Sequence, residues 1–178
     1  AAGGVGVTAI EIAKVMGARV IAAASSNEKL EFAKDVGADE TVNYTKSSLK
    51  EAVKELTNGK GVDVVYDPVG GELTDAALRA TAWHGRYLVI GFASGDIPKF
   101  AANILLLKEA SAVGVWWGTW AAKNPHKHIQ NIKELGAMIA SGNITPRVTE
   151  EFTIDQYKEA FEVITERRAK GKVILTMN

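Results

Sequence analysis

The residues best suited to chemistry stand at the start of the chain, in Ala1-Ala2-Gly3-Gly4-Val5-Gly6. An apolar, helix-like stretch follows directly, from Val7 to Met16. Read as A-x-G-x-x-G, this spacing fits the turn between the first strand and first helix of a dinucleotide-binding fold. Gly3 would let a pyrophosphate approach the backbone, Gly6 would let helix and strand pack closely, and the helix N-terminus would offer N–H groups. A plain turn explains the glycines equally well, and Ala1 stands where a first glycine is usual.

The second candidate position lies where an NAD-selective fold carries Asp or Glu, about twenty residues beyond the glycines. Here that position holds Ala24-Ser25-Ser26-Asn27. A carboxylate would repel a 2′-phosphate, so its absence favours NADP. Lys29 could supply positive charge, and Ser25 and Ser26 could donate hydrogen bonds. The alternative is that Ser26 only caps a helix and Lys29 is solvated.

Two further side chains are expected at strand ends. Tyr44 could point back toward the same phosphate, or could be a half-buried tyrosine without a ligand. Asp67 could reach a ligand beyond the strand edge, although capping the next turn is the commoner role. No lysine stands four residues after any tyrosine, so the Tyr-x-x-x-Lys pair of short-chain dehydrogenases is absent.

The composition is that of an ordinary soluble globular domain, with 47% hydrophobic and 24% charged residues among 178. Basic and acidic residues both number 21, so no net field recruits nucleic acid or an anionic membrane. The lack of cysteine excludes disulfides and Cys-ligated metals, and the two-residue spacing of His126 and His128 argues against a metal site. We expect a cytoplasmic protein, or a mitochondrial one if a transit peptide lies upstream of Ala1, which is not Met.

Strands and helices alternate with short connections through the first half of the chain. This alternation predicts parallel βαβ units and an α/β fold of the Rossmann type: a doubly wound, mainly parallel sheet with helices on both faces, in three layers. A hydrophobic first strand would precede the glycines, but the sequence starts after it. The expected strands are 19–24, 40–44, 61–67 and 86–91, and the expected helices are 7–16, 26–37, 47–56 and 73–83.

The second half is less regular. Residues 92–98 form a loop at the C-terminal end of a strand, the edge where open α/β sheets bind ligands. Residues 110–117 are a strand candidate, and the nearby Trp116, Trp117 and Trp120 favour core packing or an edge strand paired with another subunit. We therefore predict a homodimer through 110–117. The remaining expected elements are a helix at 125–141, an extended segment at 144–153, a helix at 154–164 and a strand at 171–175.

As a set, the motifs resemble the cofactor-binding half of the medium-chain dehydrogenase/reductase superfamily, and within it the zinc-independent quinone oxidoreductase group. The similarity runs nearly end to end, and many ordered motifs are more specific than any single one. The motifs are Ala1-Ala2-Gly3-Gly4-Val5-Gly6, Gly37-Ala38, Val42-Asn43-Tyr44, Gly61-Val62-Asp63-Val64-Val65, Val69-Gly70-Gly71, Gly85-Arg86, Gly91-Phe92-Ala93-Ser94-Gly95, Asn103-Ile104-Leu105-Leu106-Leu107-Lys108 and Gly171-Lys172-Val173.

The resemblance implies that NADPH binds with its pyrophosphate on residues 3–6. It also implies a 2′-phosphate near Ser25, Lys29 and Tyr44. Arg167, or the arginine that follows it, is a further implied phosphate contact. The implied cofactor-binding residues are Gly3, Gly4, Val5, Gly6, Ser25, Ser26, Lys29, Tyr44, Asp67, Val69, Gly91, Phe92, Ser94 and Arg167.

The turn Asp67–Gly70 would line the adenosine side of the cofactor, and Gly91–Ser94 would lie along the nicotinamide. The reaction implied for the family group is hydride transfer from NADPH to a quinone or an activated alkene, without a catalytic zinc. A GroES-like catalytic domain would precede residues 1–178, so we expect this segment alone to be inactive. Because no residue here is an evident general acid or base, a non-catalytic nucleotide-sensing or interaction module is the alternative.

Overall fold

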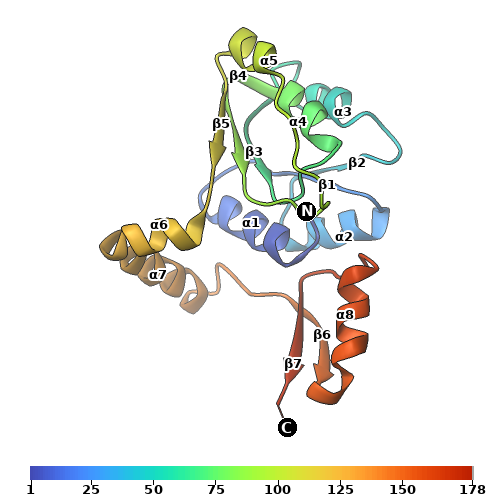
Figure 1. Cartoon of the computed structure of the whole chain (residues 1–178), viewed down its shortest axis with the longest axis vertical. Coiled ribbons are helices and arrows are strands. Elements are labelled where there is room, and N and C mark those ends of the chain that lie inside the picture. The colour runs from blue at the N-terminus through green and yellow to red at the C-terminus, as the bar shows by residue number, and fades with distance from the viewer. Residues whose placement is uncertain (178) are drawn as a thin grey trace. The chain divides into compact units, whose positions relative to one another are not determined.

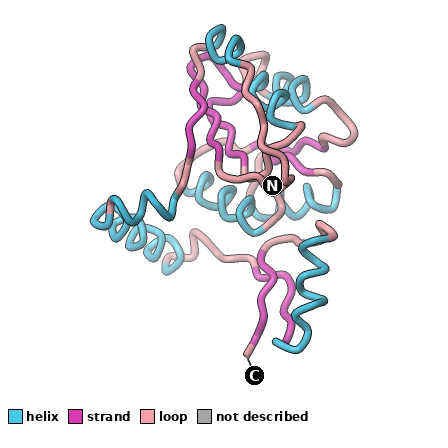
Figure 2. The backbone as a smooth tube through the Cα atoms, in the orientation of Figure 1, coloured by secondary structure: helices cyan, strands magenta, loops and turns pink. Residues whose placement is uncertain are grey.

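The computed structural model describes residues 1–177, which form two compact units. The first comprises residues 1–43 together with those from Gly136 onward, and the second comprises Tyr44–Leu135. Helices and strands alternate in each unit (Figures 1 and 2), and every pairing between the named strands is parallel. The expected α/β architecture of parallel strands and helices is therefore confirmed. No helix within residues 1–177 has the length and apolarity needed to cross a membrane.

The first unit contains two parallel strand pairs. One is β1–β2, in register from Ile21 opposite Glu40 to Ala24 opposite Asn43, and the other is β6–β7. The helix α7 runs from the second unit into this one. The elements of the first unit are α1 (Gly4–Val15), β1 (Ile21–Ala24), α2 (Asn27–Val36), β2 (Glu40–Asn43), the end of α7 (Pro125–Ala140), β6 (Val148–Thr153), the 3₁₀ turn η1 (Ile154–Gln156), α8 (Tyr157–Thr165) and β7 (Lys172–Thr176).

The helix α2 follows the sequence rules closely. The Ser26 hydroxyl accepts a hydrogen bond from the backbone N–H of Lys29 at 3.3 Å, as an N-cap does. Gly37 ends the helix with a φ of +123°, a conformation that favours glycine. Between these ends Leu30 and Ala33 are buried, and Ala33 joins a core built by α1, α2 and β1. Burial of this stripe holds the N-terminus of α2 in place.

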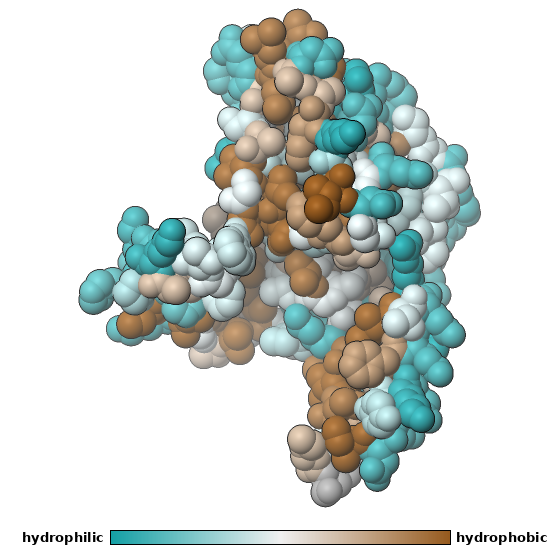
Figure 3. Space-filling model, viewed as in Figure 1, coloured by the Kyte–Doolittle hydropathy of each residue, from teal (hydrophilic) through white to brown (hydrophobic). Residues whose placement is uncertain are grey.

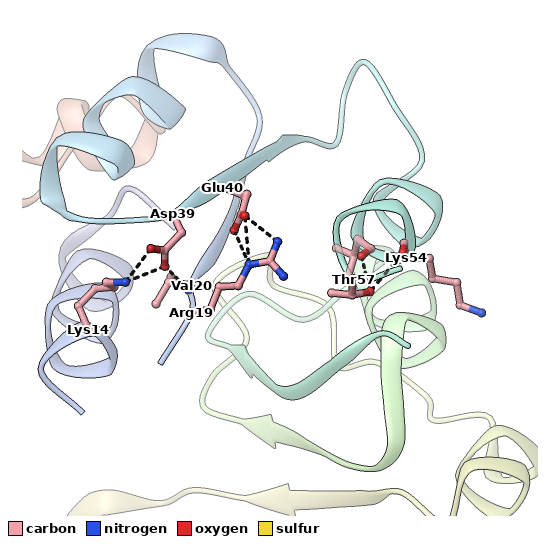
Figure 4. A network of polar contacts seen from close by, with 8 residues as sticks. Lys14, Arg19, Val20, Asp39, Glu40, Lys54 and Thr57 are labelled. Atoms are coloured by element: carbon pink, nitrogen blue, oxygen red, sulfur yellow. Dashed lines mark hydrogen bonds and ion pairs between the residues drawn. The ribbon is translucent and has the colours of Figure 1, made fainter. Parts of the chain in front are cut away.

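Two ion pairs brace the segment between α1 and β2 (Figure 4). Lys14 Nζ lies 2.7 Å from Asp39 Oδ1, and the bond from Lys14 holds the pKa of the Asp39 carboxyl below its usual range. Arg19 Nη2 lies 2.6 Å from Glu40 Oε1. Both pairs are partly solvated, so each contributes little to the stability of the fold. Their role is mainly to fix the start of β1 beside β2.

Apolar side chains gather over β7 in the lower part of Figure 3, while polar side chains cover the outer side of α8. Leu175 and Met177 expose 38% and 82% of their surface. The neighbouring α8 exposes Phe161 and Ile164 as well. A contiguous apolar surface of this kind is typical of an interaction site.

The second unit is built on one three-stranded parallel sheet in the order β3-β4-β5. Its core contains Leu78, Tyr87 and Ile104, with the Phe100 ring edge-on to Tyr87 at 5.1 Å. Thr57 ends α3 by donating its hydroxyl to the Val53 carbonyl at 2.7 Å (Figure 4). The elements of the second unit are α3 (Leu49–Leu56), β3 (Val62–Asp67), α4 (Leu73–Ala80), β4 (Thr81–Val89), α5 (Ala102–Lys108), β5 (Ser111–Gly114), α6 (Trp117–Lys123) and most of α7.

The boundary between α4 and β4 differs from the prediction of a helix to residue 83. The helix ends at Ala80, and Thr81 is already extended, fully buried and bonded through its hydroxyl to the Leu78 carbonyl at 2.6 Å. His84, which lies between the predicted helix and the predicted strand at 86–91, is in a bulge within β4, where φ is +58° and the register to β3 shifts. Tertiary burial of Thr81 overrides the helical pattern there.

The predicted strand 110–117 is also shorter in the structure. β5 ends at Gly114, and Trp117 begins α6 instead of continuing the strand. Trp116 and Trp117 expose 78% and 59% of their surface, so the core-packing interpretation of this cluster is wrong for both. The Trp117 ring lies edge-on to His128, with centroids 5.3 Å apart. The helix after Asn124 begins at Pro125 as predicted.

Candidate functional site

The glycine loop packs against the chain that leads into it. A Cβ atom placed on Gly6 would lie 2.1 Å from the Ala1 carbonyl oxygen and 2.6 Å from its carbon. No side chain fits at those distances, so glycine is required for α1 to approach the preceding backbone this closely. This is the close-packing role that the A-x-G-x-x-G spacing predicts for Gly6.

Gly3 has a different environment. A Cβ atom placed there would meet nothing within 4 Å, so no packing contact in residues 1–177 explains the glycine. Gly3 is the N-cap of α1, and the first N–H groups of a helix have no partner within the helix. Open backbone at a helix N-terminus suits a phosphate group. The binding of a pyrophosphate at this loop, which the family resemblance implies, stays a prediction.

The connection between α8 and β7 is fastened to this loop. The Gly171 N–H donates to the Ala2 carbonyl at 2.8 Å, and Gly3 and Gly171 form a parallel bridge. Gly171 has a φ of +66°, and a Cβ there would lie 2.5 Å from the Arg147 carbonyl oxygen. Both observations require glycine at this position. The contacts of Gly171 with Ala2 and Gly3 hold residues 167–170 next to the glycine loop.

An open pocket of about 460 Å³ lies between residues 167–170 and the N-terminus of α2, with Glu150 of β6 also in its lining. Four of its side chains are cationic and two are carboxylates, which gives the lining a net charge of +2 at pH 7. A phosphate monoester carries nearly two negative charges at that pH. The lining residues are Ser25, Ser26, Glu28, Lys29, Glu150, Arg167, Arg168 and Lys170.

Lys29 links the two sides of the pocket. Its ammonium donates a hydrogen bond to the Arg167 carbonyl at 2.6 Å, at an exposed position, so Lys29 has a partner within the chain while its role toward a phosphate stays a prediction. An ammonium has three N–H donors, which leaves two for a ligand. Arg167 has a left-handed φ of +58°, a conformation usually left to glycine after a helix. The Lys29 charge thus lies at the C-terminal end of α8, where a cation is stabilised.

A carboxylate that the sequence pattern does not predict also lines this pocket. Glu28 stands just beyond the segment 24–27, which does lack Asp and Glu as predicted. Its Oε1 atom lies 2.5 Å from Lys170 Nζ. The pattern does not predict a role for Lys170 either, although Lys170 ends the basic run that starts at Arg167. Glu28 and Lys170 are 142 residues apart, so no local pattern predicts their contact.

In the second unit, Asp67 caps the turn that follows β3. Its Oδ1 atom accepts from the N–H groups of Val69 and Gly70 at 2.8 and 3.0 Å. The buried Tyr87 hydroxyl donates to Oδ2 and lies 3.3 Å from the Thr74 hydroxyl. Burial, with the bond to Asp67, raises the pKa of Tyr87. The capping role that was the commoner expectation for Asp67 is therefore confirmed.

The loop after β4 lies against this turn. The Ser94 N–H donates to the Val69 carbonyl at 3.0 Å, and a Cβ on Gly71 would lie 2.9 Å from Ser94 Oγ. The structure thereby brings Asp67, Val69, Gly91, Phe92 and Ser94 together at the C-terminal ends of β3 and β4.

Phe92 exposes 43% of its surface, and Val69 exposes 37%. Tyr44, the first residue of the second unit, is half-buried directly after β2. Within residues 1–177, no group of three or more His, Asp or Glu side chains is placed to hold a metal ion.

Comparison with known proteins places this chain in a family. Residues 4–141 match the model of the zinc-binding dehydrogenase family, which is well over half of the chain. The chain belongs to this family. Quinone oxidoreductase-like protein 2 of Bos taurus is 41% identical over 178 residues, which cover 99% of this chain and 51% of that protein. The chain spans about half the length of the curated relatives it matches.

Solved structures of relatives agree with the fold. The quinone oxidoreductase of Escherichia coli, in complex with NADPH, has a TM-score of 0.88 and 29% identity, covering 98% of this chain and 54% of that one. Mycobacterial Rv1454c, also in complex with NADPH, has a TM-score of 0.89 and 30% identity, covering 98% and 55%. The fold is Rossmann-like, as in these structures, and the predicted similarity to the quinone oxidoreductase group is confirmed.

Proposed function

We propose that residues 1–178 form the NADP-binding domain of an NADPH-dependent oxidoreductase of the medium-chain type. The observation that carries this proposal is the cationic pocket beside the N-terminus of α2, at the position where an NAD-selective fold places a carboxylate. Its net charge matches a 2′-phosphate. The two similar solved structures with NADPH bound give further support.

The chain offers distinct groups to each part of the cofactor. The backbone of residues 3–6 and the N-terminus of α1 would hold the pyrophosphate. Ser25, Lys29 and Arg167 would hold the 2′-phosphate through charge-assisted hydrogen bonds, with Ser26 fixing the start of α2. Tyr44 remains a predicted phosphate contact.

The resemblance to the family assigns further residues to the rest of the cofactor. We expect Asp67 and Val69 on the adenosine side and Gly91, Phe92 and Ser94 along the nicotinamide. The Asp67 carboxylate accepts hydrogen bonds from the N–H groups of the turn that follows it, so Asp67 would act by holding the shape of that turn. The exposed Val69 would contact the adenosine.

Bound NADPH supplies a hydride, and we propose a small quinone or activated alkene as its acceptor. The bovine relative is named a quinone oxidoreductase-like protein, which supports this substrate class. The substrate-binding and catalytic groups would come from a GroES-like domain elsewhere in the protein. The exposed apolar surface over β7 is a suitable contact for such a domain.

Quinone-dependent oxidation of NADPH by the full-length protein tests this function. We expect turnover with a small quinone and none with residues 1–178 alone. NADPH binding by the full-length protein, without turnover of any quinone or enone, would instead support the nucleotide-sensing module.

We also propose a homodimer through the edge of β5. Among the described residues β5 pairs with β4 alone, and all four of its residues are exposed. An exposed strand edge favours pairing with a second copy.

A further inference from the structure

Glu28 poses a problem for the phosphate pocket. Its side chain lines the pocket. A carboxylate there would repel a phosphate, for the same reason that Asp or Glu at the end of the second strand selects against NADP. Because 72% of the Glu28 side chain is exposed, burial does not force the carboxylate to become neutral. Some other group must offset its charge.

Lys170 is that group. Its Nζ lies 2.5 Å from Glu28 Oε1, and its side chain is only 32% exposed. The hydrogen bond and charge of Lys170 lower the pKa of Glu28, so the carboxylate is ionised and paired at neutral pH. Glu28 in turn raises the pKa of Lys170. The two charges therefore cancel locally across the normal pH range.

The backbone holds Lys170 in position from both sides. The Lys170 carbonyl accepts a hydrogen bond from the Thr149 hydroxyl. The next residue, Gly171, donates to the Ala2 carbonyl at 2.8 Å. Lys170 is thus anchored to β6 and to the glycine loop before any ligand arrives, and its ammonium can reach Glu28 without reorganising the chain.

The other charged groups of the pocket leave Glu28 no equivalent partner. Lys29 Nζ donates to the Arg167 carbonyl, and Arg168 Nε is bound to Glu166 at 2.6 Å. Arg167 forms no ion pair in the part of the chain that the structure describes, and Glu150 on β6 adds a second negative charge. Of the lining cations, only Lys170 is bonded to Glu28.

We propose that the Glu28–Lys170 ion pair sets the anion selectivity of this pocket: Lys170 masks the Glu28 carboxylate, and the pocket then admits a 2′-phosphate. This inference rests on the proposed function, in which the pocket holds the 2′-phosphate of NADPH. The ion pair affects specificity, because NADH carries no phosphate at this position and its affinity does not depend on the pair.

Charge counting gives the direction of each substitution. Lys170→Met leaves Glu28 unpaired and lowers the net charge of the lining from +2 to +1, whereas Glu28→Gln raises it to +3. The double variant returns the net charge to +2 and leaves no carboxylate at position 28. A unit charge near a dianion in partly solvated surroundings corresponds to roughly a fivefold to tenfold change in affinity.

Calorimetric titration of the full-length protein with NADPH and with NADH tests the proposal. We expect Lys170→Met to weaken NADPH binding roughly fivefold to tenfold, Glu28→Gln to strengthen it, and the double variant to bind like the wild type. NADH affinity should stay constant in all three. Circular dichroism melting curves establish that each variant is folded. If Lys170→Met does not fold, Glu28→Gln still tests the proposal, because this substitution removes only a charge.

Two results separate the proposals. If the wild type prefers NADPH but the variants change NADPH and NADH affinity by the same factor, the ion pair does not set selectivity, and the proposed function stands. If the wild type binds NADPH and NADH with equal affinity, the pocket makes no favourable contact with the 2′-phosphate, and both proposals fail.

Discussion

Replacing Arg167 by glycine should weaken phosphate binding while stabilising the fold. Arg167 adopts a left-handed backbone, with φ at +58°, directly after the end of α8. That conformation costs an L-residue about 1–2 kcal/mol, and glycine avoids this cost. Glycine also has more conformational freedom in the unfolded state, and the loss of that freedom on folding lowers the free energy of unfolding by about 0.5–1 kcal/mol. The difference predicts that Arg167→Gly raises the free energy of unfolding by about 0.5–1 kcal/mol.

The same substitution removes the guanidinium from the pocket. A hydrogen bond to a charged group is worth about 1.5–3 kcal/mol, and the solvent exposure of Arg167 places it at the lower end, so NADPH affinity should fall about tenfold. NADH affinity should change little. Arg167→Ala is the matched control, because it removes the guanidinium and keeps the backbone strain. Only the glycine variant should be stabilised, while both should lose the same affinity.

Urea denaturation measures the first effect, and titration with NADPH and NADH measures the second. Equal destabilisation by glycine and alanine would refute the backbone argument. Unchanged NADPH affinity in both variants would show that Arg167 does not contact the phosphate, and Arg168 would then become the candidate.

Three further predictions concern Lys29, the glycine loop and the edge of β5. Lys29→Ala should remove most of the difference between NADPH and NADH affinity, and a titration in which that difference persists would contradict its role. Gly6→Ala should destabilise the fold by about 1–3 kcal/mol, because the new Cβ would collide with the Ala1 carbonyl. Gly3→Ala should leave the melting temperature unchanged and weaken NADPH binding. Light scattering should give the mass of a dimer, and a charged residue in place of Val113 on β5 should produce monomers; a monomeric wild type would exclude the edge-strand dimer.

The parts of the fold that local chemistry determines could be predicted from the sequence. The ends of α2 follow from the capping by Ser26 and the positive φ of Gly37, and the parallel strands follow from the alternation of elements. The limits of β4 could not be predicted in this way, because the burial of Thr81 and the bulge at His84 depend on β3 lying alongside. The exposed Trp117 was missed because a strand-like composition continues into α6.

In the candidate site, too, local patterns could be predicted from the sequence and long-range contacts could not. The glycine loop and Lys29 belong to recognisable local patterns near the start of the chain. Glu28 and Lys170 do not, because their contact joins residues 142 positions apart and depends on the Gly171 connection reaching the loop. Long-range pairing therefore supplies the charge balance of the pocket, which no short motif encodes.

The most direct test of the central claim is the ratio of NADPH to NADH affinity in the wild-type protein, measured by titration at low and at high salt. The pocket predicts that NADPH binds at least about tenfold more tightly at low salt, and that added salt narrows the ratio by screening the lining cations. Equal affinities at low salt would contradict the claim that this pocket binds the 2′-phosphate.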